Sequence, residues 1–268
     1  MPKRDSTSYT ILFATAVCVV CALLVSVAAV GLQPRQAAAA RLYMEKNVLL
    51  AAGLLEPGAE VTAQDVNRVF DERIRVRLVD LASGELVPEG KIDARGYDQR
   101  KARGDPAASR VAPPNNAGIG RVPNFAVVYF IMKDSGKKDG AVDQIVIAVE
   151  GLGMWGTVYG FVSLDRDTNT VRGLTYYDQK ETPGLGGEIG NPKWQATWRG
   201  RKVFDDEWNA RITVIKGQAG AADADPLHVD GLSGATVTSN AVTRLMQFWL
   251  SDNGYGKFLR RFREGAIT

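Results

Sequence analysis

Asp230-Gly231-Leu232-Ser233-Gly234-Ala235-Thr236-Val237-Thr238 is the most informative stretch of this chain, and it lies directly ahead of an amphipathic helix. Gly231 and Gly234 carry no Cβ, so this turn lets the backbone approach a bulky group closely. A helix start offers free N–H groups and a partial positive charge, which together favour a phosphate. The stretch therefore predicts a place beside Thr236 where a phosphorylated group would bind.

The helix after this turn is expected to begin near Thr238 or Ser239. Its apolar residues recur at the spacing of a single buried helix face. They are Val242, Leu245, Met246, Trp249 and Leu250. The simpler interpretation of such a turn is that Thr238 or Ser239 caps the helix. Both interpretations hold together if one of these residues caps the helix while Thr236 carries a ligand.

Short apolar or alternating stretches upstream of this helix predict a sheet. The expected strands are residues 74–78, 125–132, 144–149, 157–164, 171–177 and 212–215. Helices are expected at residues 45–55, after Thr62 as N-cap, and after Asn191 with Pro192 at the first helical position. Consecutive hairpins with few helices predict an α+β fold around a mostly antiparallel sheet. Residues 93–123, rich in Arg, Gly, Pro and Asn, are expected to form an extended surface loop.

Residues 9–32 contain no charged side chain and are dominated by Ala, Val, Leu and Ile. About 20 apolar residues suffice to cross a bilayer, so this run predicts a single transmembrane helix in the lipid bilayer. A secretory signal peptide is the alternative, since Lys3 and Arg4 precede the run and residues 37–40 resemble a cleavage site. Signal peptides have apolar regions of roughly 7–15 residues, which favours the uncleaved anchor. The expected division is a tail over residues 1–8, the anchor over 9–32, a connecting region over 33–123 and a ligand-binding domain over 124–268.

The formal net charge of the 268 residues is +3, which argues against a dedicated nucleic-acid binder. Basic residues gather at the C-terminus, where a solvated or partner-facing tail is expected. They are Lys257, Arg260, Arg261 and Arg263. Both cysteines, Cys18 and Cys21, lie in the apolar run, where a helix–helix contact is favoured over a redox or metal pair. The remaining chain therefore has no disulfide, thiolate-held zinc or cysteine-ligated cluster of its own.

The turn at residues 230–238 resembles the flavinylation signature of FMN-binding domains, an Asp-Gly-x-Ser-Gly-Ala-Thr-x-Thr pattern of which every position is filled. The resemblance implies that Thr236 forms a phosphoester bond with one FMN, with Ser233, Gly234 and Ala235 around the attachment. It also implies that Asp230 orders the turn or helps to bind metal during flavin transfer, with a plain Asx turn as the alternative. The enzyme implied for the attachment is a separate flavin transferase that uses FAD and magnesium.

A second stretch, Glu181-Thr182-Pro183-Gly184-Leu185-Gly186-Gly187-Glu188, supports this resemblance. Alone it is a turn between a strand and a helix, and it matches neither a phosphate-binding P-loop nor a dinucleotide fingerprint. In the FMN-binding family such a segment lies beside the isoalloxazine ring. The resemblance therefore implies that Thr182, Gly184 and Leu185 contact the ring.

Two further residues are candidates for the flavin site. Trp155 is expected either to pack near the flavin or to belong to the ordinary core. Lys216 follows an expected strand, and a cation near N1 and the C2 carbonyl of the ring would stabilise anionic reduced flavin. The alternative for Lys216 is a solvated lysine at a strand end.

Residues 150–161, Glu-Gly-Leu-Gly-Met-Trp-Gly-Thr-Val-Tyr-Gly-Phe, narrow the family further. With residues 165–171 and 190–194 they resemble the C subunits of bacterial sodium-translocating NADH:quinone oxidoreductases. The resemblance implies an electron carrier that takes electrons from an iron–sulfur centre in the membrane and passes them to the FMN of the B subunit. Its implied partners are the A, B, D, E and F subunits, with NADH bound elsewhere in the complex. The domain is implied to lie in the periplasm, on one anchor in the inner membrane.

Three alternatives stay open at this point. The related subunit of Rnf complexes shares the turn at residues 230–238, called the acceptor turn below, and the loop at residues 181–186. A membrane-anchored FMN-binding sensor or regulatory protein would carry FMN but have no place in an electron chain. A structural subunit without flavin, which only scaffolds the complex, is the third possibility.

Overall fold

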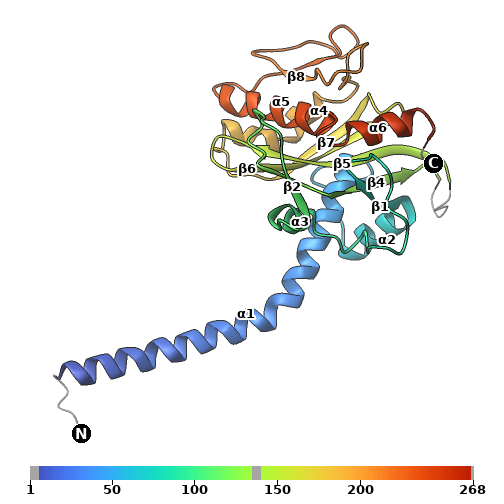
Figure 1. The fold of residues 1–268 in the computed structure, drawn as a ribbon. Helices are drawn as coiled ribbons and strands as arrows, with labels where there is room; N and C mark the ends of the chain where they lie inside the picture. Colours follow the sequence, from blue (N-terminus) through green and yellow to red (C-terminus); the bar gives the residue numbers. More distant parts are fainter. Residues whose placement is uncertain (1–5, 135–139, 267–268) are drawn as a thin grey trace. The chain divides into compact units, whose positions relative to one another are not determined.

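Five antiparallel strands form the central sheet, in the order β1-β4-β5-β6-β7 (Figure 1). The computed structural model of the protein describes residues 6–134 and 140–266. The strands are β1 (Ile74–Asp80), β4 (Phe125–Met132), β5 (Val142–Leu152), β6 (Thr157–Asp165) and β7 (Val171–Asp178). Each covers a stretch that the sequence predicts as a strand from apolar or alternating residues. The four strands β4 to β7 follow one another as hairpins, and β1 pairs with the outer side of β4.

Helices cover both faces of this sheet. Figure 1 shows α4 (Pro192–Ala196), α5 (Thr236–Leu250) and α6 (Gly256–Arg263) on one face. The end of α1 (Thr7–Ala51), together with α2 (Ala63–Arg73) and α3 (Gln99–Gly104), lies on the other face. Successive side chains of a strand point to opposite faces, so a strand covered on both sides is apolar throughout. The middle of the central strand β5 fits this description, because its residues 145–149 are all apolar and all but Ala148 are buried. The α+β class is confirmed.

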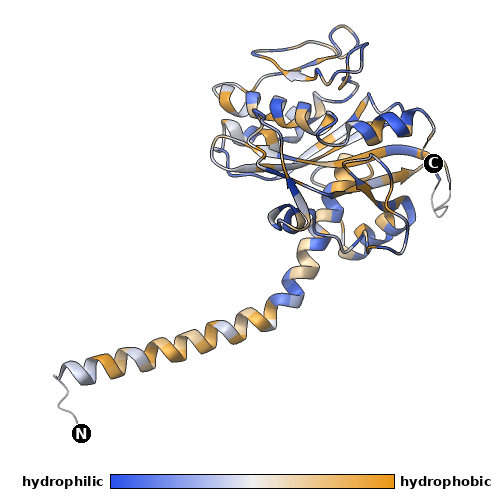
Figure 2. Ribbon diagram, in the orientation of Figure 1, coloured by the Kyte–Doolittle hydropathy of each residue, from blue (hydrophilic) through white to orange (hydrophobic). Residues whose placement is uncertain are grey.

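Helix α1 is one continuous helix of 45 residues, and the separate helix expected over residues 45–55 is wrong. The polar residues after the apolar run suggested a break, yet Ala37–Ala40 and the following long side chains are good helix formers, so the helix continues past Pro34. Figure 2 shows hydrophobic residues along much of its N-terminal part, and the helix is long and apolar enough to cross a membrane. Of the tail expected over residues 1–8, residues 1–5, with Lys3 and Arg4, lie outside the described residues.

The chain divides into two compact units between Met44 and Glu45. The last residues of α1 therefore belong to the sheet domain, where Val48, Leu49 and Ala51 are fully buried. A Cβ on Gly173 of β7 would come within 2.3 Å of the Ala51 carbonyl oxygen, so glycine is needed for this close approach. The boundary expected between residues 123 and 124 stays a prediction, but β1 and the end of α1 pack in the same unit as the later strands.

Thr62 caps α2 as predicted. Its hydroxyl accepts a hydrogen bond from the Asp65 N–H, and the Asp65 carboxylate accepts one from the Thr62 N–H in return. Asn191 likewise caps α4 with Pro192 at the first position. Three short elements complete this part of the chain, the 3-10 helix η1 (Gly186–Gly190) and the parallel strands β8 (Thr213–Val214) and β9 (His228–Val229).

The extended loop expected over residues 93–123 is wrong. This segment contains α3 and a two-stranded ribbon of β2 (Ser109–Val111) and β3 (Arg121–Pro123). Its side chains at Ala117, Ile119 and Val122 are buried in the main core. The elements are too short to show a periodicity in sequence, so composition alone suggested a loop.

The prediction of a solvated or partner-facing C-terminal tail is also wrong, because the basic residues belong to α6. The apolar face of this helix is buried through Phe258, Leu259 and Phe262. The basic residues have partners on the domain: Arg260 pairs with Asp252, Arg261 with Glu85, and the Lys257 ammonium donates to the Ala82 carbonyl. The spacing of three apolar residues among the arginines was the signal that could have found this helix.

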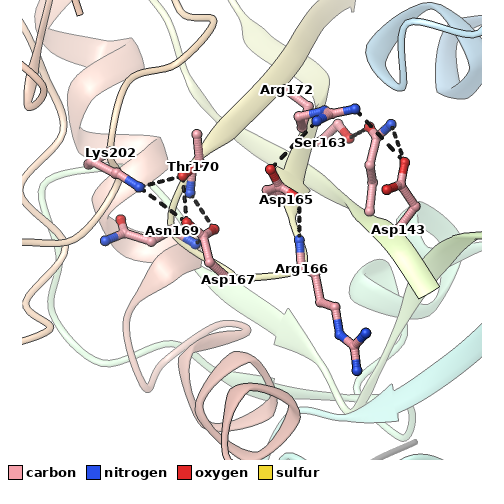
Figure 3. A network of polar contacts seen from close by, with 10 residues as sticks. Asp143, Ser163, Asp165, Arg166, Asp167, Asn169, Thr170, Arg172 and Lys202 are labelled. Atoms are coloured by element: carbon pink, nitrogen blue, oxygen red, sulfur yellow. Dashed lines mark hydrogen bonds and ion pairs between the residues drawn. The ribbon is translucent and has the colours of Figure 1, made fainter. Parts of the chain in front are cut away.

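The turn between β6 and β7 carries a network of polar contacts (Figure 3). Asp167 accepts hydrogen bonds from the Asn169 and Thr170 N–H groups, and the Lys202 ammonium lies 3.1 Å from its carboxylate. The Asn169 side-chain oxygen accepts from the backbone of Val203 and Phe204. These contacts tie the turn to the segment after α4, so the network is structural.

Asp167 is expected to stabilise the fold in a pH-dependent way. Burial raises the pKa of this carboxyl, but the hydrogen bonds from Thr170 and Asn169 and from Lys202 outweigh it, so the pKa is lowered from 3.8. A lowered folded-state pKa means that the stabilisation is present above the unfolded pKa and is lost as the pH falls through the folded value. Because the Asp167 side chain is 44% exposed and solvent screens its contacts, Asp167→Asn should lower the free energy of unfolding by no more than about 1 kcal/mol near neutral pH.

Urea unfolding of both proteins at several pH values tests this expectation. The difference between wild type and Asp167→Asn should shrink on acidification below the unfolded pKa of the carboxyl. Asp206→Asn serves as the control, because Asp206 is exposed. Its free energy of unfolding should differ little from that of wild type at every pH. A difference for Asp167→Asn that grew on acidification would contradict the sign of the shift.

Candidate functional site

Helix α5 begins at Thr236, two or three residues earlier than expected. Its N-cap is Ala235, whose side chain has no oxygen to offer the first N–H groups. Thr236 is therefore the first helical residue, and its side chain is exposed. The N–H groups of a first helical turn have no partner within the helix, so this end is open to an anionic group.

Thr238 and Ser239 do not cap α5, so the expected cap is wrong. Both side chains are buried. The Thr238 hydroxyl donates a hydrogen bond to Glu181, and the Ser239 hydroxyl accepts one from the Leu232 N–H at 3.3 Å. Residue type suggested caps, but these hydroxyls lie inside the domain and hold other segments. Of the two threonines in this turn, Thr236 is exposed and Thr238 is buried.

A cavity of about 750 Å³ opens beside Thr236. Four of the candidate residues line it together with Thr236, namely Ser233, Gly234, Asp230 and Lys216. Asn191, Lys193 and Trp194 of the α4 region form another part of its wall. The structure thus brings the acceptor turn and two lysines to one cavity. Ala235 is buried beneath it as the N-cap.

Asp230 orders the acceptor turn by a contact that is not an Asx turn. Its carboxylate accepts a hydrogen bond from the Ala219 N–H at 2.8 Å, eleven positions away. Its carbonyl accepts one from the indole of Trp194, also at 2.8 Å. The Gly231 N–H donates to the Gly217 carbonyl at 2.7 Å. The turn is therefore held between α4 and the segment that follows β8.

Gly231→Ala is expected to displace the acceptor turn. A Cβ at Gly231 would lie 2.1 Å from the Ile215 carbonyl oxygen, and the Ile215 backbone is held by the hydrogen bond from its N–H to the Val229 carbonyl at 2.9 Å. We expect a loss of about 1–3 kcal/mol in the free energy of unfolding, measured by urea denaturation. Ser233→Ala, on the exposed side of the same turn, should stay within about 0.5 kcal/mol of wild type. Equal stability of the two variants would contradict the close contact.

Trp155 and the loop at residues 181–186 form a second, more exposed surface. Trp155 is 64% exposed, so the interpretation that it belongs to the core is wrong. Its indole N–H donates to the Thr182 hydroxyl at 3.1 Å. Leu185 is 43% exposed, and a Cβ on Gly234 would lie 3.0 Å from its side chain. This loop therefore touches the acceptor turn.

The candidate residues divide between these two surfaces. Thr182, Gly184, Leu185 and Trp155 lie outside the lining of the cavity, whereas Lys216 lies in it with Thr236. Gly184 has a φ of +74°, a backbone conformation that favours glycine in this loop. Flat exposed apolar side chains suit a ring system, and lysines with free helix N–H groups suit a phosphate. The residues present therefore fit a flavin phosphate at Thr236.

Glu181 is the residue of this region that sequence reasoning missed. It lies at the start of the loop, is 5% exposed, and contacts both the turn of Trp155 and the first turn of α5. Motif matching singled out the loop after it, because the loop glycines are the visible part of the pattern. A glutamate directly before a glycine-rich loop was the only local signal.

Two arginines of α3 contact β5 and β6, the two strands that flank the turn carrying Trp155. Arg103 of α3 forms an ion pair with Glu150 at 2.8 Å, and Arg100 stacks on the Tyr159 ring with its guanidinium carbon 3.4 Å from the ring centre. Burial raises the pKa of Glu150 and outweighs the opposite effect of the two arginines. These contacts join α3 to the strands that present the turn, so they are structural support.

Comparisons with known proteins agree with these features. The family model described as FMN-binding domain matches residues 153–251. The chain is 43% identical over 267 residues to the C subunit of the Na(+)-translocating NADH-quinone reductase of Yersinia pestis, covering 99% of this chain and 96% of that protein. It is 41% identical over 268 residues to the protein of the same name from Pseudomonas aeruginosa, covering 99% of each.

A solved structure shares the fold. The crystal structure of Shewanella oneidensis NqrC superposes with a TM-score of 0.74 at 28% sequence identity, covering 84% of this chain and 98% of that one. The antiparallel sheet domain with its helices is therefore an architecture that has been observed by experiment.

Proposed function

The chain belongs to the family formed by the C subunits of Na(+)-translocating NADH-quinone reductases, and we propose from this that it carries one FMN covalently on Thr236 and relays electrons within that complex. One observation carries the covalent part of this proposal. Thr236 presents an exposed hydroxyl at a helix start whose N-cap is an alanine, beside a cavity that contains Lys216. FMN, when bound, accepts and gives up electrons, and the protein supplies its attachment and surroundings.

The chain's own residues have separate tasks in this proposal. The first N–H groups of α5 and the ammonium of Lys216 or Lys193 compensate the charge of a phosphodiester at Thr236. Asp230 and Gly231 hold the turn in place through the segment after β8. Thr182, Gly184, Leu185 and Trp155 offer the surface for the ring. Asp230 as a metal ligand during transfer stays a proposal from the resemblance.

Attachment is a phosphoryl transfer catalysed by a separate transferase. The Thr236 oxygen attacks the phosphorus of the FMN half of FAD, the bond to the AMP half breaks, and AMP leaves. The hydroxyl proton of Thr236 passes to a base of the transferase. Magnesium, which the resemblance implies for the transferase, would supply positive charge against the pyrophosphate. The turn needs only an accessible hydroxyl, which the exposure of Thr236 provides.

The proposed electron route comes from the family resemblance. Electrons arrive from an iron–sulfur centre of the membrane subunits and leave to the FMN of the B subunit. NADH is oxidised elsewhere in the complex, which the A, B, D, E and F subunits complete. Helix α1 anchors the domain in the inner membrane as a single pass, and the domain faces the periplasm. The apolar, exposed residues of α1 support the anchoring.

Intact-mass analysis of the chain isolated from its own cells tests the covalent proposal. The expected mass exceeds that of the unmodified residues by one FMN less one water. Fragmentation of the modified peptide should place the addition on Thr236. An unmodified mass in material from cells that contain the transferase would overturn the proposal.

A further inference from the structure

Glu181 joins two segments of the candidate site through its carboxylate. One oxygen accepts hydrogen bonds from the N–H groups of Met154 at 2.9 Å and Trp155 at 3.0 Å. The other oxygen accepts the hydroxyl of Thr238. The side chain is 5% exposed, so these donors take the place of water around a buried carboxylate.

Two glycines leave room for this contact because they have no Cβ. A Cβ on Gly153 would lie 2.5 Å from the carboxylate of Glu181. A Cβ on Gly186 would lie 2.4 Å from the Thr238 hydroxyl and 2.9 Å from the carboxylate. Both glycines leave the space that Glu181 and Thr238 occupy. The glycine pattern of these loops is therefore explained by the buried carboxylate as well as by turn formation.

We propose that Glu181 is a positioning residue for flavin attachment, an inference that rests on the proposed function. Its carboxylate fixes the first turn of α5 against the turn that presents Trp155. By holding the Thr238 hydroxyl inside the domain, it leaves Thr236 as the threonine of this turn that a transferase reaches. Thr238 is 1% exposed, whereas Thr236 is exposed.

Two substitutions separate the charge of the side chain from its hydrogen bonds. Glutamine at position 181 keeps an oxygen that accepts the two backbone N–H groups, and its amide faces the Thr238 hydroxyl. Alanine leaves all three donors without their acceptor. If positioning is the role, Glu181→Gln retains most of the wild-type behaviour and Glu181→Ala loses it.

Hydrogen exchange in the full chain, made in cells without the transferase, gives the first readout. The amides of Met154 and Trp155 should exchange at least tenfold faster in Glu181→Ala than in wild type, and at most threefold faster in Glu181→Gln. Glu45→Ala is the matched control, since it removes an equally buried carboxylate that pairs with Arg95 elsewhere in the domain. It should lower thermal stability without changing the exchange of these two amides.

The rate of FMN attachment, followed by intact mass after addition of transferase and FAD, gives the second readout. At a temperature where all variants are folded, Glu181→Ala should be at least fivefold slower than wild type. Glu181→Gln and Glu45→Ala should keep at least half of the wild-type rate. The modified peptide of each should still map to Thr236.

The outcomes distinguish this inference from the proposed function. Unchanged exchange at Met154 and Trp155 in Glu181→Ala would overturn the positioning role. Faster exchange with a wild-type attachment rate would overturn its link to flavin transfer. A wild-type chain that takes up no FMN would overturn the proposed function, while the exchange measurement would still decide whether Glu181 holds the two turns.

Discussion

Thr236→Ala is expected to abolish covalent flavin on the chain. The phosphoester needs a hydroxyl at this position, and alanine has none. Thr236 is the first residue of α5 and is exposed, so the substitution removes no buried contact and the fold should remain intact. We expect the fluorescence of the denatured chain on a gel under ultraviolet light to fall to background, and its intact mass to equal that of the unmodified residues.

Thr238→Ala is the matched control for this experiment, because it removes a hydroxyl two residues away. That hydroxyl is buried against Glu181, so its loss weakens the fit of α5 but leaves the acceptor in place. The chain should stay fluorescent, with the flavin on Thr236. Both proteins must come from a host that contains the transferase. A fluorescent Thr236→Ala chain would show that the acceptor is a different residue.

Trp249→Ala is expected to give the largest loss of stability. Trp249 is fully buried in α5, and its indole N–H donates to the Glu150 carbonyl at 2.6 Å. Its ring also lies against Phe248 and Tyr255, with centroids 5.7 Å apart in each case. Removing a large buried aromatic side chain lowers the free energy of unfolding by about 3–5 kcal/mol. The unpaired carbonyl of Glu150 adds to this loss.

Urea unfolding of Trp249→Ala is compared with that of Trp155→Ala. Both variants replace tryptophan by alanine, so the comparison measures the effect of burial. Trp155 is largely exposed, so its substitution should change the free energy of unfolding by about 0.5 kcal/mol or less. A loss below about 2 kcal/mol for Trp249→Ala would mean that the α5 face of the sheet tolerates a cavity. That result would contradict the packing described for this face.

The sheet could be predicted from the sequence because its strands are long and their apolar residues are consecutive. Residues 125–132 and 157–164 each carry enough apolar side chains to identify a buried strand without knowledge of its neighbours. Asn191 and Pro192 identified the start of α4 by local chemistry alone. The acceptor turn was found in the same way, since its glycines and hydroxyl residues are adjacent in sequence.

Contacts between distant segments could not be predicted. Thr238 looks like a helix cap until Glu181, 57 positions away, is placed against it. One of the two interpretations of Trp155 placed it in the core, and that interpretation was wrong. The exposure of a side chain depends on which surfaces the rest of the fold leaves uncovered. In α3 the single buried residue Ala102 gives no periodic signal, so that helix was hidden in a polar segment. Such roles depend on packing, which local patterns do not encode.

The way α1 ends inside the sheet domain determines where the domain can be cut free from its anchor. Residues up to Met44 belong to the other unit, and a protease acting between about Gln33 and Met44 would leave every buried side chain of the domain in place. Cleavage after Ala51 would instead remove Val48 and Leu49 and uncover the β7 surface at Gly173. A water-soluble fragment suitable for flavin chemistry therefore has to retain the last two turns of the helix.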